Sequence, residues 1–180
     1  MRKTLRLSLV IWFGAVCGAA ADEDLSDRFR AVGAQVRQAA VDLGTIRVQG
    51  ENNGGYRVSL TVSADRVRGE TNGGYPVDLA LSREAGSCRV TGRMLGGYPV
   101  DAVLTSGRVS GRTMGGYPLK LELKDGRLSG VAKAYEVSLM LDGLGAAGMG
   151  VGSFRVRLAM SAPLDDCQFV AVALAVLHRH

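Results

Sequence analysis

The sequence is poor in histidine, a side chain on which acid–base catalysis and metal binding often depend. Only His178 and His180 occur, both within the last three of 180 residues. We expect them to lie in a frayed tail, because chain termini are seldom held by packing. A Ser-His-Asp set or a histidine-ligated metal centre is therefore not expected in the body of the chain. The prediction is a non-enzymatic protein with no catalytic residue, no metal and no cofactor.

One phrase does match a nucleotide-binding pattern, since Gly143, Gly145 and Gly148 have the Gly-x-Gly-x-x-Gly spacing. That pattern binds a pyrophosphate only where it joins a strand to the N-terminus of a helix. Here more glycine follows, and then another expected strand. We therefore predict that residues 143–152 form a Gly-rich loop without a nucleotide. The apolar side chains of this loop leave open a contact with a membrane surface.

An excess of one charge is also missing from most of the chain. The sequence has 22 Lys and Arg against 17 Asp and Glu, but Arg2, Lys3 and Arg6 stand together at the N-terminus. The single tryptophan, Trp12, lies in the same region. The rest of the chain is close to neutral and has no basic stripe interleaved with aromatic residues. A nucleic-acid partner is therefore not expected.

No apolar run in the sequence is long enough to cross a bilayer as a helix. The run from Leu7 to Val16 follows a basic segment and precedes the small residues Ala19 to Ala21. This arrangement predicts a cleaved secretory signal over residues 1–21 and a secreted or periplasmic protein. The outer membrane is a second possible location.

Cysteine is scarce, with three residues in the chain. Cys17 falls in the predicted signal, and Gly14 to Val16 match the usual lipoprotein pattern poorly, so we expect Cys17 to be removed. Cys88 and Cys167 remain. In an oxidising compartment such a pair predicts a disulfide.

Glycine, in contrast, is abundant, with 25 residues, many of them in a repeated phrase. The repeat reads Arg-(Val/Leu)-x-Gly-x-x-x-Gly-Gly-Tyr-Pro-(Val/Leu)-x-Leu-x-Leu and recurs about five times, at steps of about 19 residues. Self-similarity at this period indicates one supersecondary unit built repeatedly. The tyrosines of the repeats are Tyr56, Tyr75, Tyr98, Tyr117 and Tyr135.

Each repeat is expected to be a β-hairpin. Apolar residues alternate with other residues from Tyr75 to Leu81, which is typical of a strand with one apolar face. Asn72 to Gly74 form a strong turn signal. A three-residue loop there pairs Thr71 with Tyr75, Val67 with Leu79, and Arg68 with Asp78. The same register sets Glu51 opposite Arg57 and Arg108 opposite Glu122, so opposite charges face each other across three hairpins.

The glycine inside each first strand is expected to leave a gap that a neighbouring tyrosine ring covers, as in aromatic rescue. A second interpretation makes the tyrosines a row at one rim of the sheet, in contact with a ligand, a glycan or a membrane surface. The sequence leaves both interpretations open.

These hairpins predict an all-β fold, an antiparallel up-and-down meander of about 10–12 strands curled into a barrel or half-barrel. Ten strands are expected in residues 45–142. Residues 153–180 are expected to add two more, over 153–161 and 167–177. An N-terminal amphipathic helix is expected over residues 22–44, because one apolar stripe recurs there at steps of three and four. A stacked β-solenoid is disfavoured because it would place the arginines of successive repeats in one like-charged ladder.

A sheet of this size must curl or fold over, and a barrel of this strand number is wider than one that side chains fill easily. We therefore expect an apolar cavity or groove and an apolar small molecule or lipid as ligand. The layout of signal, helix and curved antiparallel sheet is similar to periplasmic lipid carriers of the lipoprotein-chaperone type. The Gly-Gly-x-Pro-(Val/Leu)-x-Leu phrase resembles strands of AsmA- and TamB-like lipid-groove proteins. The candidate ligand-binding residues are Tyr75, Val77, Leu79, Tyr98, Val100, Tyr117, Leu119 and Leu121.

Two alternatives remain from the sequence alone. In an outer-membrane β-barrel the apolar face would meet lipid and the tyrosines would form a girdle. The alternating segments are shorter than such strands usually are. In a structural or self-associating surface protein the repeats would stack, although frequent charges and the lack of Gln and Asn ladders argue against a fibre.

Overall fold

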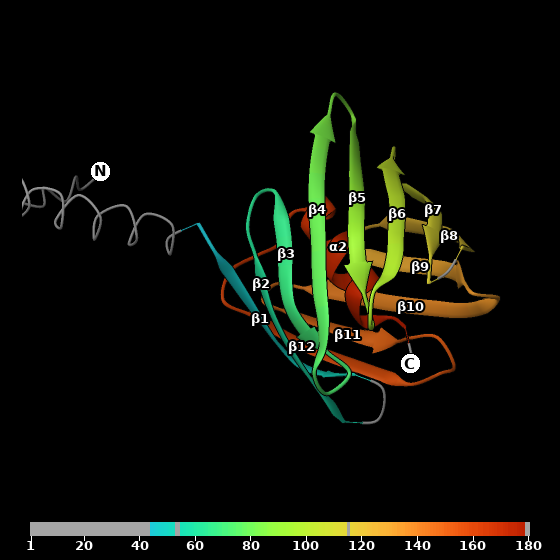
Figure 1. Ribbon diagram of the computed structural model, residues 1–180. Coiled ribbons are helices and arrows are strands. Elements are labelled where there is room, and N and C mark those ends of the chain that lie inside the picture. Colours follow the sequence, from blue (N-terminus) through green and yellow to red (C-terminus); the bar gives the residue numbers. More distant parts are fainter. Residues whose placement is uncertain (1–43, 53–54, 115, 179–180) are drawn as a thin grey trace, which may run out of the picture. The chain divides into compact units, whose positions relative to one another are not determined.

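The computed structural model describes residues 44–52, 55–114 and 116–178. The predicted signal (1–21), and the predicted helix over 22–44 except Gly44, lie outside these residues. The described residues form twelve strands and one helix (Figure 1). Their bounds are β1 (Ile46–Asn52), β2 (Tyr56–Val62), β3 (Arg66–Thr71), β4 (Tyr75–Glu84), β5 (Ser87–Met94), β6 (Tyr98–Thr105), β7 (Arg108–Thr113), β8 (Tyr117–Lys124), β9 (Arg127–Ala132), β10 (Tyr135–Asp142), β11 (Gly145–Met149), β12 (Arg155–Met160) and α2 (Asp166–Val176).

The strands form an antiparallel up-and-down meander. Each strand pairs with its neighbours in the chain, and β1 also pairs with β12, so the sheet closes into a barrel. The predicted all-β meander is thereby confirmed, in its barrel form rather than as a half-barrel. The antiparallel pairing excludes the stacked solenoid.

The predicted hairpin register is also confirmed. Thr71 pairs with Tyr75 and Val67 pairs with Leu79, which sets Arg68 opposite Asp78. The same frame holds in the first and fourth hairpins, where Glu51 lies opposite Arg57 and Arg108 opposite Glu122. Since side chains alternate between the two faces of a strand, this register points the apolar set of each hairpin into the barrel.

The Gly-rich segment 143–152 is not a loop, and this prediction was wrong. Gly145–Met149 form β11, which pairs with β10 and with β12. Strands β11 and β12 together form a sixth, diverged copy of the hairpin. Gly148 occupies the place of the in-strand glycine, and Phe154 occupies the place of the tyrosine. The physical reason for the error is that the divergence removed the Gly-Gly-Tyr-Pro phrase while keeping the backbone conformation.

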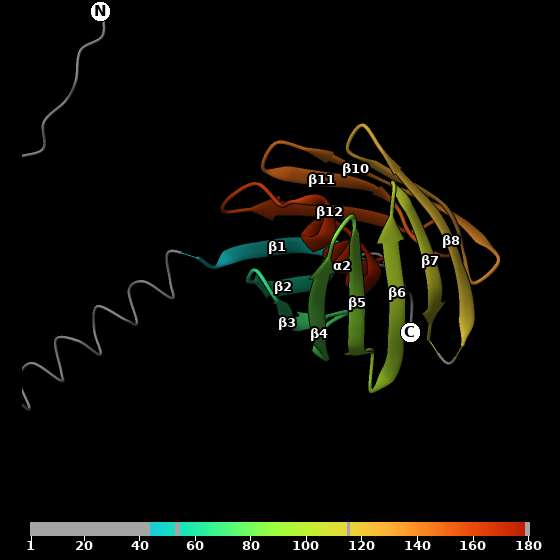
Figure 2. The ribbon, with the colours of Figure 1, turned by 90° about the horizontal axis from the view of Figure 1, so that it is seen from above.

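The predicted final strand over 167–177 was also wrong, because Asp166–Val176 form helix α2. Asp165 caps the helix N-terminus through a capping box with Gln168. Figures 1 and 2 both show α2 enclosed by the strands. A helix inside a barrel is apolar on every side, so it has no polar face whose 3.6-residue period would identify it. The same run of Val, Leu and Ala also fits a strand that is buried on both faces.

The hydrophobic core lies between α2 and the inner wall of the barrel. Residues Cys167 to Val176 are all buried, and α2 packs against β2, β3, β4 and β5. The inward side chains of the other strands join the same continuous cluster. We call the barrel end that contains the turns after β1, β3, β5, β7, β9 and β11 the tyrosine end. The opposite end, where α2 begins beside Cys88, is the disulfide end.

The in-strand glycines form a ring around the barrel, one on each odd-numbered strand. A Cβ atom at any of them would collide with the backbone of the neighbouring even-numbered strand. At Gly92, for example, it would lie 2.9 Å from the Cα atom of Leu79, and the φ angle there is +146°. The prediction of a gap covered by a tyrosine ring was wrong, because two backbones approach each other where the gap was expected. Glycine at repeated positions of this kind lets barrel strands bend sharply. The members of the ring are Gly50, Gly69, Gly92, Gly111, Gly130 and Gly148.

Candidate functional site

The structure separates the candidate ligand-binding residues into two groups. The five aliphatic residues point into the barrel and are at most 3 % exposed. They belong to the continuous core. Tyr75 lies at the tyrosine end and packs partly against that core, whereas Tyr98 and Tyr117 are exposed there. The aliphatic group consists of Val77, Leu79, Val100, Leu119 and Leu121.

Helix α2 occupies the interior in which an apolar ligand was expected. The side chains of Phe169, Val172 and Leu174 have no accessible surface. Inward residues on the far wall, such as Leu128 and Leu139, are equally inaccessible. A ligand in the interior would therefore have to replace α2.

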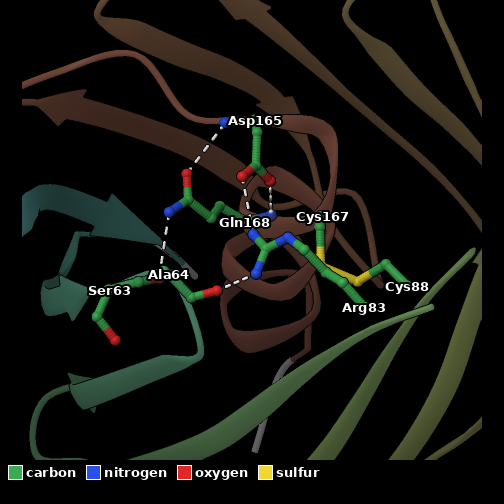
Figure 3. The surroundings of a disulfide bond; sticks show 7 residues. All are labelled: Ser63, Ala64, Arg83, Cys88, Asp165, Cys167 and Gln168. Carbon is green, nitrogen blue, oxygen red and sulfur yellow. Dashed lines mark hydrogen bonds and ion pairs between the residues drawn. A yellow bond between two sulfur atoms is a disulfide. The ribbon is translucent and has the colours of Figure 1, made fainter. Parts of the chain in front are cut away.

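The disulfide end holds α2 by several contacts (Figure 3). Cys88 on β5 and Cys167 on α2 lie within disulfide distance, with their Cα atoms 5.8 Å apart. Arg83 forms an ion pair with Asp165 at 2.8 Å and also donates a hydrogen bond to the carbonyl of Ala64. The side-chain amide of Gln168 donates a hydrogen bond to the carbonyl of Ser63. The N-terminal end of α2 is thus attached to the sheet by a disulfide, an ion pair and a hydrogen bond.

The tyrosine end holds the other end of the helix through polar side chains of the inner wall. The amide of Asn52 donates a hydrogen bond to the carbonyl of Val176, and the amide of Asn72 donates one to the carbonyl of His178. The His178 Nε2 atom lies 3.2 Å from the Thr113 hydroxyl. Burial lowers the pKa of His178 to about 4, and the charge of Lys133 adds to this shift. The expected frayed tail was therefore wrong for His178, whereas His180 lies outside the described residues.

The repeated tyrosines form a row along the rim of the tyrosine end. Some of their rings lie against the next hairpin along the chain, with Tyr56 beside the turn glycine Gly73 and Tyr75 beside Gly96. The ammonium of Lys133 sits over the Tyr117 ring, 5.0 Å from its centroid. The rings therefore connect neighbouring hairpins, yet much of their surface remains open to solvent. The exposed tyrosines, each 44–53 % accessible, are Tyr56, Tyr98, Tyr117 and Tyr135.

The outer wall of β3 to β6 is charged and internally paired. Asp78 accepts hydrogen bonds from Arg66 at 2.7 and 2.8 Å, and Asp101 accepts them from Arg89 at 2.9 and 2.8 Å. These hydrogen bonds lower the pKa of both aspartates and raise the pKa of both arginines. This wall therefore carries paired charges rather than apolar side chains.

The outer wall of β9 to β11 differs because apolar side chains flank a groove of about 470 Å³. Val131 on β9 and Met149 on β11 line the groove and are each 40 % exposed. Ser129 on β9 and Ser138 on β10 are paired across the two strands and also line the groove. Because their side chains are small, they fill little of it. Arg127 and Glu136 supply charge at the groove. The sequence analysis missed this groove, because it depends on β11 being a strand.

Among the described residues, no group of three or more His, Cys, Asp or Glu side chains could hold a metal ion. In the same part of the chain, no helix is long and apolar enough to cross a membrane. No family model, curated protein or solved structure matches this chain.

Proposed function

We propose that this chain is a secreted or periplasmic, non-enzymatic protein that binds a lipid-like or other apolar ligand on the outside of its barrel. The observation that carries the proposal is the groove between Val131 and Met149. A recess that combines exposed apolar side chains with a few polar groups is characteristic of a binding site.

The composition of the groove supports an apolar ligand of variable shape. Methionine is unbranched and flexible, so Met149 can adapt to different partners. Arg127 donates a hydrogen bond from its Nε atom to the Ser138 hydroxyl at 3.1 Å, and its other N–H groups and the Ser129 hydroxyl can hydrogen-bond to a polar group of such a ligand. The interior, in contrast, offers no space while α2 occupies it.

The two alternative functions are less well supported by the geometry. The paired charges outside β3 to β6 would face lipid if this were an outer-membrane barrel. A self-associating fibre would need free strand edges, whereas each described strand is paired on both sides. Barrel closure removes the edges on which strand-to-strand assembly depends.

An environment-sensitive apolar probe, N-phenyl-1-naphthylamine, tests the proposed site. The protein without its signal should bind the probe, and the double substitution Val131→Asn/Met149→Gln should weaken binding at least tenfold. Leu144→Gln is the matched control, because Leu144 is 52 % exposed but does not line the groove. Equal binding by all three proteins would contradict the proposed location. Binding that appears only after reduction of the disulfide would instead locate the site in the interior.

Native mass spectrometry of protein purified without detergent, followed by organic extraction, would identify a natural ligand. Adduct masses that extract as lipid are expected from the wild type and should be depleted in the groove variant. A bound molecule that stays in the aqueous phase would argue against an apolar ligand.

A further inference from the structure

The six hairpins differ systematically at one position of the tyrosine end, directly after the in-strand glycine. The side chains there are acidic on β1 and β3, basic on β5 and β7, and apolar on β9 and β11. All six are exposed and point outward. In chain order they are Glu51, Glu70, Arg93, Arg112, Val131 and Met149.

Because the strands follow one another around a closed barrel, these positions divide the rim into three sectors. We name the sectors after these residues of the odd-numbered strands, as acidic (β1 to β4), basic (β5 to β8) and apolar (β9 to β12). The even-numbered strands add other charges at the same level, since Arg57 pairs with Glu51, Glu136 with Val131 and Arg155 with Met149. The boundary between the basic and apolar sectors lies across the barrel from the acidic sector. A flat surface that contacts this boundary therefore avoids the acidic side of the rim.

The two arginines of the basic sector are available to an external anion. Asp78 is the cross-strand partner of Arg93, but its carboxylate is hydrogen-bonded to Arg66. Asp101 is the cross-strand partner of Arg112, but its carboxylate is held by Arg89 in the same way. No ion pair of Arg93 or Arg112 is present among the described residues. Local carboxylates are thus already engaged by arginines further from the rim.

Exposed tyrosines stand in all three sectors of the rim, including Tyr56 in the acidic sector. Tyr98 and Tyr117 stand in the basic sector, where Lys133 lies over the Tyr117 ring, and Tyr135 begins the apolar sector. Tyrosine is favoured at the boundary between lipid headgroups and acyl chains, because its ring is apolar and its hydroxyl is polar. Basic residues beside such rings match anionic headgroups.

We infer that the basic and apolar sectors of the tyrosine end together dock onto an anionic lipid bilayer surface. The contact lies where the two sectors meet: Arg112 on β7 and Lys133 contact headgroup phosphates, and Val131 on β9 enters the interface. Arg93 on β5 and Met149 on β11 are six strands apart in the twelve-stranded barrel and do not both face this surface. This inference rests on the proposed function, because it places the apolar groove against the membrane from which a lipid would come. The rim, rather than a loop over 143–152, is the membrane-contacting element.

Vesicle flotation tests this docking surface with the protein that lacks its signal. Vesicles of phosphatidylcholine with 30 mol% phosphatidylglycerol should bind the protein at 50 mM NaCl. Pure phosphatidylcholine vesicles should bind it much less, and 300 mM NaCl should weaken binding because salt screens charges at the surface. Arg112→Gln/Lys133→Gln should lower the partition coefficient roughly 25-fold, about fivefold for each cation near an anionic surface.

The matched control is Arg47→Gln/Arg57→Gln, which removes the same charge away from the basic and apolar sectors. An equal loss of binding in both double variants would overturn the inference. Non-specific electrostatic attraction between the protein and the anionic vesicles would then explain the binding. Equal binding to neutral vesicles would also overturn it, as would competition by millimolar inorganic phosphate, which would indicate a site for free anions. If vesicles fail to bind while the apolar probe still binds at the groove, only the docking inference fails. Loss of both would contradict the proposed function as well.

Discussion

At the scale of single residues, the ring of in-strand glycines sets how closely neighbouring strands approach. Each glycine touches the backbone of the adjacent strand through the space that a side chain would need. At Gly69, Gly92, Gly111 and Gly130 the φ angle is also between +140° and +146°, a region that other residues rarely adopt. Any other residue at these positions would therefore be destabilised in two ways, by a collision with the neighbouring strand and by backbone strain.

Gly92→Ala tests this conclusion. The added Cβ would meet the Leu79 backbone and the backbone would be strained, so we expect a loss of about 2–4 kcal/mol in unfolding free energy. Gly145→Ala is the control, since the nearest atom to its Cβ would be 3.6 Å away and its φ angle is not positive. Urea denaturation of both variants measures the difference. Similar stabilities would show that the strands can separate without cost.

His178 makes the stability of the barrel depend on pH. Its pKa falls from an ordinary value of 6.5 in the unfolded chain to about 4 in the folded chain. Between these values the unfolded chain binds more protons, so stability is present above pH 6.5 and is lost as the pH falls toward 4. A shift of this size corresponds to roughly 3 kcal/mol.

Unfolding free energies measured between pH 7 and 4 should therefore fall more steeply for the wild type than for His178→Gln. The carboxylates titrate in both proteins, so the difference between the two curves isolates the histidine. Parallel curves over this range would mean that His178 is accessible to protons in the folded protein.

At the scale of elements, α2 is the unusual feature, because a helix stands where barrel strands usually enclose a ligand or side chains alone. Its small residues Ala171, Ala173 and Ala175 alternate with larger ones, and all are buried. Its two ends are fixed differently, by a disulfide at one end and by hydrogen bonds from the inner wall at the other.

Removal of the disulfide should weaken the attachment of α2. Cys88 and Cys167 are separated by 79 positions in the sequence, for which loop-closure entropy predicts a contribution of roughly 4–5 kcal/mol. The double variant Cys88→Ser/Cys167→Ser should lose stability of this order in urea denaturation. Wild-type protein under reducing conditions should behave in the same way. An unchanged midpoint in both experiments would contradict the pairing.

The hairpins could be predicted from the sequence because their information is local. Asn72 to Gly74 define the turn, and the opposite charges of Arg68 and Asp78 confirm the register. Helix α2 carries a local signal too, the capping box of Asp165 and Gln168 after Pro163. That signal is short, and the apolar run after it fits either secondary structure. Only the space inside the closed barrel decides between them.

The groove was less predictable than the strands. Val131 can be placed on the outer face of β9 from the repeat alone. Met149 becomes its neighbour across β10 only when Gly145–Met149 form a strand, and the diverged sixth repeat concealed that strand. The occupation of the interior likewise required the position of α2. The sequence predicted which side chains face inward, but it could not predict what lies against them.

At the scale of the whole molecule, the closure of the barrel and the filling of its interior depend on each other. The barrel closes where β1 pairs with β12, through contacts such as Val48 with Met160. The interior of a barrel with this many strands is too wide for wall side chains alone to fill. Helix α2 supplies the missing volume, so the closed sheet and the buried helix should form together.

A chain that ends after Ser161 should therefore fail to fold cooperatively, although it keeps all twelve strands. The apolar inner wall would enclose empty space, and each lost buried side chain would forfeit several kcal/mol. A chain that ends after His178 is the control and should fold normally. Circular dichroism during heating measures both transitions. A sharp transition in the shorter chain would show that the barrel can collapse around its own side chains.

The order of the elements, with α2 after all six hairpins, also has a consequence for biosynthesis. A polypeptide is made from its N-terminus, so all six hairpins leave the ribosome before the segment that occupies their interior exists. Until residues 166–178 appear, the nascent sheet can neither complete its core nor bring Cys167 to Cys88. A premature stop codon directly before α2 would thus be as damaging as one in the middle of the repeats, because every strand that precedes the helix needs it to complete the core.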